Sequence, residues 1–276
     1  MKIFRVIRWL PILFLISVLV SGCADSMGEK MPDNTADTTG TTFGTEKETE
    51  KSSESQSDII SWFTADINDD EKKELLMITK DSSSAVMTLA TGERYGTGLK
   101  IYSKFAILND TPVPQGEPDY QFDLTEIKPL DIQAGDINGD GIAEIAVCVY
   151  KTAEFHPVPA KRPFFYDLKE GRLEPIWLGS RLSRPFADCI LFDVDHDDIE
   201  EIISIEFTEN GNKVLTVYDW KGFGFEVKAI SNEIEGTVNF LNNTNSRADV
   251  VLVEIAGESH QLYLEEGEVI KCIKDY

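Results

Sequence analysis

The nine residues Asp-Ile-Asn-Gly-Asp-Gly-Ile-Ala-Glu, at positions 136–144, decide the fold that this sequence predicts. Acidic or amide side chains stand at relative positions 1, 3, 5 and 9, and the run Ile-Ala-Val-Cys-Val-Tyr follows at once. Such a short run, rich in β-branched residues, is typical of a strand. The pattern recurs in Asp66, Asn68, Asp70, Glu74; in Asp136, Asn138, Asp140, Glu144; in Asp193, Asp195, Asp197, Glu201; and, more weakly, in Leu241, Asn243, Asn245, Asp249.

This spacing predicts calcium binding. Calcium takes roughly six to eight oxygen ligands, and a tight loop supplies them when the side chains at positions 1, 3 and 5 turn inward. Position 6 needs a sharp turn, which suits Gly141, is tolerable for Asp198 and is poor for Glu71. We therefore expect up to three Ca²⁺ sites, with the second loop the best formed. The alternative is a set of ordinary acidic turns, which is favoured for the fourth copy.

The flanks of the loops argue against an EF-hand. That motif places a bidentate Glu at position 12 and a helix on each side. Position 12 is Met77, Val147 or Ser204 in the three complete copies, and the flanking runs are strand-like.

The second loop, with its Asp-x-Asn-x-Asp-Gly run, later acidic residue and hydrophobic strand, resembles the calcium loop of FG-GAP and VCBS repeats. These repeats form the blades of integrin-α-type β-propellers and occur in many bacterial surface proteins. The resemblance covers residues 59–276 and implies an all-β, β-propeller-like domain of about four four-stranded blades. Two features depart from the family: position 9 is Glu rather than Asp, and the Phe-Gly and Gly-Ala-Pro marks are missing from their expected places.

Hairpin signals after the loops fit such blades. Three pairs of strand-like runs flank turns that contain Gly, which permits positive φ. The pairs are 164–168 with 173–178, 214–220 with 223–227, and 261–264 with 269–273. The long first interval contains Thr111-Pro112-Val113-Pro114 and leaves room for another strand pair, and convincing helical periodicity is absent.

The N-terminus predicts export and lipidation. Residues 1–22 combine three basic residues with the apolar run 9–20, which is short for a membrane-spanning helix of about 20 residues. Val20-Ser21-Gly22-Cys23 resembles the lipobox of bacterial lipoproteins, which implies lipid attachment at Cys23. Residues 24–58 lack Ile, Leu and Val, so we expect residues 23–58 to form a disordered tether. A plain secretory signal or a membrane helix is the alternative.

The net charge limits the classes of molecule that the protein can bind, and the spacing of the cysteines bears on whether they form disulfides. The formal net charge of −23 argues against nucleic acid, whose binding depends on clustered Lys and Arg. We expect the lipid to hold the protein at the cell membrane, facing the extracytoplasmic side, with an unknown protein or glycan as ligand. Cys148, Cys189 and Cys272 are expected to be small buried side chains, with one disulfide as the alternative.

No recognisable catalytic motif occurs in the sequence. We therefore predict a non-catalytic binding or scaffold module. The alternative is an envelope enzyme, such as a hydrolase acting on glycan or peptide through an unrecognised carboxylate site, or an accessory subunit. Residues 156–159 and 177–181 are expected to be long loops and the first place to search for a partner site, although Trp177 fits buried packing.

Replacing Cys23 with Ala should abolish lipidation, because the thiol that would receive the lipid is removed. The measurement is incorporation of labelled fatty acid by cells that express the full chain, with Cys272→Ala as the matched control. Continued labelling of the Cys23→Ala variant would show that another residue is modified.

Overall fold

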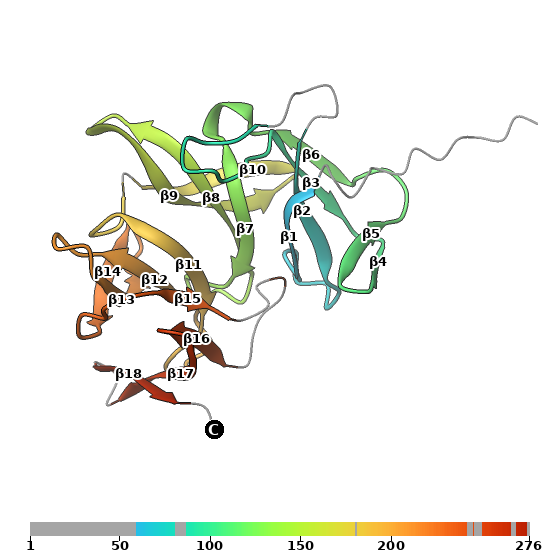
Figure 1. The fold of residues 1–276 in the computed structure, drawn as a ribbon. Helices are drawn as coiled ribbons and strands as arrows, with labels where there is room; N and C mark the ends of the chain where they lie inside the picture. The colour runs from blue at the N-terminus through green and yellow to red at the C-terminus, as the bar shows by residue number, and fades with distance from the viewer. Residues whose placement is uncertain are drawn as a thin grey trace, which may run out of the picture. The chain divides into compact units, whose positions relative to one another are not determined.

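Four antiparallel sheets arranged in a ring form a four-bladed β-propeller (Figure 1). The computed structural model describes residues 59–80, 87–179, 181–241, 245, 250–265 and 269–274. The predicted all-β fold with four four-stranded blades is confirmed. The predicted signal peptide, Cys23 and the tether lie outside the described residues. Within the described chain, no helix is long and apolar enough to cross a membrane.

Each blade is one contiguous stretch of chain. The first contains β1 (Ile59–Ala65), β2 (Glu74–Thr79), β3 (Gly98–Tyr102) and β6 (Tyr120–Asp123). The second contains β7 (Pro129–Gly135), β8 (Glu144–Ala153), β9 (His156–Lys169) and β10 (Arg172–Leu178). The third contains β11 (Phe186–Phe192), β12 (Glu201–Phe207), β13 (Lys213–Trp220) and β14 (Phe225–Ile230). The fourth contains β15 (Val238–Phe240), β16 (Val251–Ile255), β17 (Glu258–Glu265) and β18 (Val269–Lys274).

The sequence predicted room for a further strand pair between the first and second acidic loops, and the structure contains one. It is the hairpin β4 (Phe105–Leu108) and β5 (Thr111–Pro114), which forms a separate two-stranded sheet between β3 and β6. A short 3₁₀ helix, η2 (Thr125–Ile127), then leads into the second blade. The three predicted hairpins also form, as β9–β10, β13–β14 and β17–β18.

The expectation of long loops at 156–159 and 177–181 is wrong for most of these residues. Residues 156–159 begin the long strand β9, and Trp177 and Leu178 end β10. The physical reason is that Arg162 anchors the hairpin from within, since its buried guanidinium donates to the carbonyl oxygens of Lys151 and Val158. Trp177 packs against Phe165 and Phe225, as expected, although it is half-buried rather than buried.

The second strand of each blade explains why the blades form a ring. Neighbouring residues of a strand point to opposite faces of the sheet, so an uninterrupted apolar run needs cover on both sides. In β12, Ile202 packs against residues of the second blade, whereas Ile203 and Ile205 pack against the fourth. In β8, Val147 faces the first blade and Ala146 faces the third.

Hydrophobic clusters fill three of the four boundaries between blades. They join the first blade to the second, the second to the third, and the third to the fourth. At the remaining boundary, between the fourth blade and the first, the backbone N–H of Thr64 donates to the carbonyl oxygen of Asn245 at 2.9 Å. A smaller cluster of Leu75, Met77 and Tyr102 lies on the face of the first blade that is turned away from the second blade.

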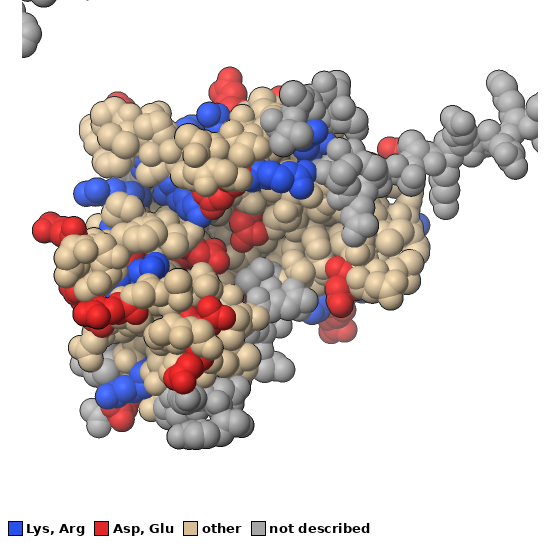
Figure 2. All heavy atoms as spheres, in the orientation of Figure 1, with Lys and Arg blue, Asp and Glu red and all other residues tan. Residues whose placement is uncertain are grey.

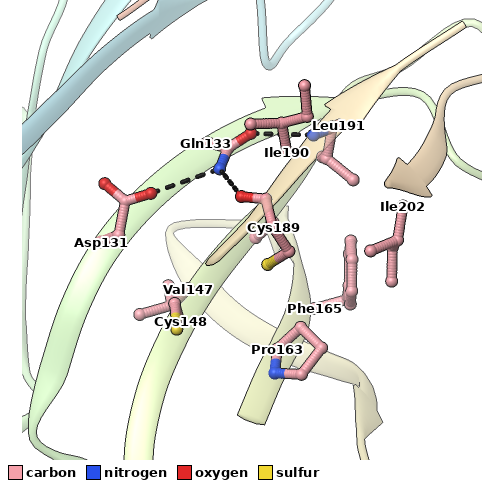
Figure 3. Close-up of a pocket in the computed structure, with 11 residues that line it drawn as sticks. Asp131, Gln133, Val147, Cys148, Pro163, Phe165, Cys189, Ile190, Leu191 and Ile202 are labelled. Carbon is pink, nitrogen blue, oxygen red and sulfur yellow. Dashed lines mark hydrogen bonds between the residues drawn. The ribbon is translucent and has the colours of Figure 1, made fainter. Parts of the chain in front are cut away.

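Gln133 holds the second and third blades together near the ring centre (Figure 3). Its amide on β7 donates to the carbonyl oxygen of Cys189 at 2.9 Å and accepts the N–H of Leu191 at 2.9 Å. Both partners belong to β11. Because β7 and β11 lie in different sheets, they form no backbone hydrogen bonds with each other, and the buried Gln133 side chain supplies hydrogen bonds between them.

The three cysteines of the body are free thiols in the structure. Cys148 and Cys189 line the same small cavity beside Gln133, and burial raises the pKa of both thiols (Figure 3). They therefore behave as partly buried apolar side chains, as expected, and the disulfide alternative is not what the structure contains.

Replacing Gln133 with Leu should destabilise the fold. The substitution leaves the Cys189 carbonyl and the Leu191 N–H without their partner, which costs roughly 2 kcal/mol for two partly buried groups. Urea denaturation of the full chain should show a lower midpoint with an unchanged slope. Gln121→Leu, on an exposed position of β6, should change stability by less than about 0.5 kcal/mol. Equal midpoints for the two variants would contradict the bridging role.

Candidate metal-binding loops

The three predicted loops connect the first strand of a blade to its second strand. The position 1 residues Asp66, Asp136 and Asp193 directly follow β1, β7 and β11, and the position 9 residues Glu74, Glu144 and Glu201 begin β2, β8 and β12. The second and third loops touch, because the N–H of Glu200 donates to the carbonyl oxygen of Asp136 at 2.8 Å. The structure therefore places these two loops side by side.

The position 1 carboxylate organises each loop. In the second loop, Asp136 accepts the N–H groups of Asn138 at 3.2 Å, Gly139 at 2.7 Å and Gly141 at 2.8 Å. Asp66 and Asp193 accept backbone N–H groups from the equivalent parts of their loops. These bonds satisfy donors that a tight turn would leave unpaired, and they turn the backbone around the aspartate.

Each loop contains two left-handed backbone positions. Position 6 has positive φ in all three, at Glu71 (62°), Gly141 (87°) and Asp198 (70°), which confirms the predicted sharp turn. Position 4 is also left-handed, at Asp69 (58°), Gly139 (77°) and His196 (65°), and this the sequence analysis missed. The residue that could have indicated this second left-handed position is Gly139, since glycine adopts positive φ at the lowest cost. The third loop makes the same turn with His196.

The position 9 glutamate is buried in every loop. Its Oε2 accepts the N–H of the position 2 residue, at 3.1 Å for Ile67, 2.9 Å for Ile137 and 2.9 Å for Val194. Burial, with the nearby Asp136 and Asp140, raises the pKa of Glu144 to about 7. A carboxylate in this position is costly to ionise without a cation, because buried charge requires a partner.

The second loop has the donor set that calcium prefers. Oxygens of Asp136, Asp140 and Glu144 lie within 4.8 Å of one another. The amide of Asn138 lies among them and donates to Glu144. Hard oxygen donors gathered in one small loop fit calcium, and these four residues would hold the ion.

The third loop already contains a positive charge. Lys228, on β14, places its ammonium 2.5 Å from Asp195, 2.6 Å from Glu201 and 3.1 Å from Asp219. Burial lowers the pKa of Lys228, but the three carboxylates outweigh it and raise the pKa. Asp193, Asp195 and Asp197 still bring oxygens within 4.8 Å of one another. The predicted ligands Asp195 and Glu201 are thus engaged by an ammonium group.

Position 3 explains why the third loop differs. In the first two loops it is an amide, and Asn68 donates to Glu74 at 3.1 Å as Asn138 does to Glu144. In the third loop it is Asp195, which cannot donate, and Lys228 bridges it to Glu201 instead. The sequence analysis missed Lys228, and its only signal was the additional carboxylate at position 3.

The first loop folds like the second but gathers fewer acidic oxygens. Among the residues that the structure describes, only the second and third loops bring three acidic groups within 4.8 Å of one another. Asp70 instead pairs with Lys72 at 3.3 Å, on the exposed side of the turn. Asp66, Asn68, Asp70 and Glu74 are therefore a weaker metal site than the second loop.

The fourth predicted loop lies mostly outside the described residues. Asn243 and Asp249 are among the undescribed positions, whereas Asn245 contacts Thr64 of the first blade. No protein-family model matches the chain, and no curated protein sequence matches it.

Replacing Lys228 with Met should destabilise the third blade and make it responsive to calcium. Removing the ammonium leaves Asp195, Glu201 and Asp219 uncompensated, a loss of about 3 kcal/mol for a largely buried ion pair. Thermal unfolding of the full chain in chelator should show this loss. Added calcium should restore part of it, because the loop oxygens are then free for the ion.

Lys221→Met is the matched control for this experiment. Lys221 also pairs with Asp219, at 2.8 Å, but its side chain is 45% exposed, so its loss should cost less than about 1 kcal/mol. A Lys228→Met variant that is as stable as Lys221→Met would show that the ammonium does not hold the third loop.

Proposed function

We propose that this chain is a bacterial lipoprotein, anchored at the extracytoplasmic side of the cell membrane, whose FG-GAP/VCBS-like propeller is a calcium-stabilised, non-catalytic binding or scaffold module. The observation that carries the proposal is the second loop, in which oxygens of Asp136, Asp140 and the buried Glu144 lie within 4.8 Å of one another.

Calcium would act on this loop as a structural ion. Its charge would compensate Asp136, Asp140 and Glu144, whose mutual repulsion otherwise opposes the closed loop. The second loop contacts the third through Glu200, so ordering one loop supports two blades. Magnesium fits less well because it requires a smaller octahedral shell and gives up its water reluctantly.

The proposed anchor rests on the sequence, through the lipobox-like residues 20–23 and the run 9–20 before them. The fold is compatible with the proposed binding or scaffold role. Figure 2 shows basic side chains in a band along the boundary between the second and third blades, with acidic side chains beside it. Such mixed charge suits a polar or charged partner better than a nucleic acid.

Replacing Asp140 with Ala should remove most of the calcium response. Calcium modules outside the cell bind with dissociation constants of about 10⁻⁴–10⁻³ M, so millimolar calcium adds roughly 0.4–1.4 kcal/mol per site. For a domain of this size, chelation should lower the unfolding temperature by about 1–5 °C. Calcium should restore the unfolding temperature of the wild type, and magnesium should restore little.

Glu174→Ala provides the control, since it removes one exposed carboxylate from β10 in the same blade. Its calcium-dependent shift should equal that of the wild type. The calcium proposal is wrong if calorimetric titration of the wild type with calcium shows no heat of binding and calcium does not shift its unfolding temperature.

A further inference from the structure

A cavity of about 330 Å³ lies where the first strands of three blades begin. Ile60 of β1, Leu130 and Asp131 of β7, and Asp188 of β11 line it, and these residues precede the acidic loops by most of a strand. The cavity therefore opens at the end of the inner strands opposite to the loops. Its volume falls at the lower end of the range of about 300–1,000 Å³ for small-molecule sites.

Equivalent positions of two inner strands, Asp131 and Asp188, line this cavity, and the equivalent residue of the third, Ser61, contacts Asp131. Ser61, Asp131 and Asp188 each stand five residues before the first aspartate of their loop. The hydroxyl of Ser61 donates to Asp131, and the Gln133 amide donates to the other oxygen of Asp131 at 3.2 Å (Figure 3). The carboxylates of Asp131 and Asp188 lie on neighbouring inner strands and repel each other. The packing of the strands therefore does not explain why both positions are aspartate.

Asp188 is the least compensated of these groups. It accepts the N–H of Cys189 at 2.9 Å, and the structure gives its side chain no ion pair among the described residues. Asp188 is an exposed residue of β11, and it lines the cavity. Burial and the nearby Asp131 raise the pKa of Asp188 to about 6.

Two basic residues, Lys161 and Arg94, also line the cavity, and both already have interaction partners. Lys161 pairs with Glu93 at 2.5 Å and donates to the carbonyl oxygen of Ala187 at 2.5 Å. Three carboxylates, those of Glu93, Asp131 and Asp188, thus line the cavity with two cations, those of Arg94 and Lys161, so one negative charge is in excess. Ile60, Leu130 and Cys148 supply apolar wall next to these carboxylates.

We infer that this cavity binds a small organic cation, a primary ammonium compound with a short apolar chain, through Asp131 and Asp188. The ammonium group matches the two carboxylates, and the alkyl chain contacts the apolar wall. A metal ion fits less well, because among the described residues these carboxylates do not join a group of three acidic oxygens within 4.8 Å. This inference rests on the proposed binding role and names its ligand class.

Titration of the full chain with 1,5-diaminopentane tests the inference. Calorimetry in saturating calcium should show saturable binding that weakens with added salt, because the contact is ionic. Asp188→Asn and Asp131→Asn should each lower the affinity by about tenfold or more, since each removes a charge-assisted bond. Asp123→Asn, on an exposed position of β6, should bind as the wild type does.

Each other outcome overturns the inference. Absence of saturable binding, equal affinity for neutral pentan-1-ol, or unchanged affinity in both cavity variants would exclude an ammonium site. Binding of a lysine-containing peptide without binding of the diamine would assign the cavity to a protein partner instead. The calcium response of the same samples reports on the loops alone, so a failed diamine titration with an intact response leaves the calcium proposal standing.

Discussion

Burial of apolar side chains on both faces of the middle strands is the constraint on which this structure depends. Strands such as β8 and β12 bury both faces, so the second and third blades each depend on a neighbouring blade on either side. A ring satisfies that requirement with few blades. It also brings the first strands close together at the centre, where Gln133 replaces backbone pairing with side-chain hydrogen bonds.

Close packing at the centre in turn demands compact connections. A loop that reverses direction in eight residues must pair its own N–H groups, and the position 1 aspartate does so. Carboxylates then accumulate in a small volume, and the chain compensates them in different ways. The first two loops use an asparagine amide at position 3, and the third uses the ammonium of Lys228. One backbone design therefore tolerates either a neutral amide donor or a cation as the partner of the buried glutamate.

The fold could be predicted from the sequence because its signals are local. The acidic spacing, the apolar run after it and the glycine-containing hairpins all lie within one blade, and their strands form as expected. The missed features depend on contacts between distant segments. Lys228 is 27 residues from Glu201 and meets it only through the strand register of the third blade. Likewise, Asp131 and Asp188 meet only because two inner strands are adjacent.

Because the first and last blades exchange no strand within the described residues, strand pairing in the described chain does not dictate the number of blades. Each blade is a separate segment of chain, and the boundary of Thr64 with Asn245 closes the ring through noncovalent contacts. In evolutionary terms, such a ring can grow or shrink by whole-segment duplication or loss without breaking any sheet. The β4–β5 hairpin illustrates the same tolerance on a smaller scale, since it was accommodated inside a blade whose four-stranded order is intact.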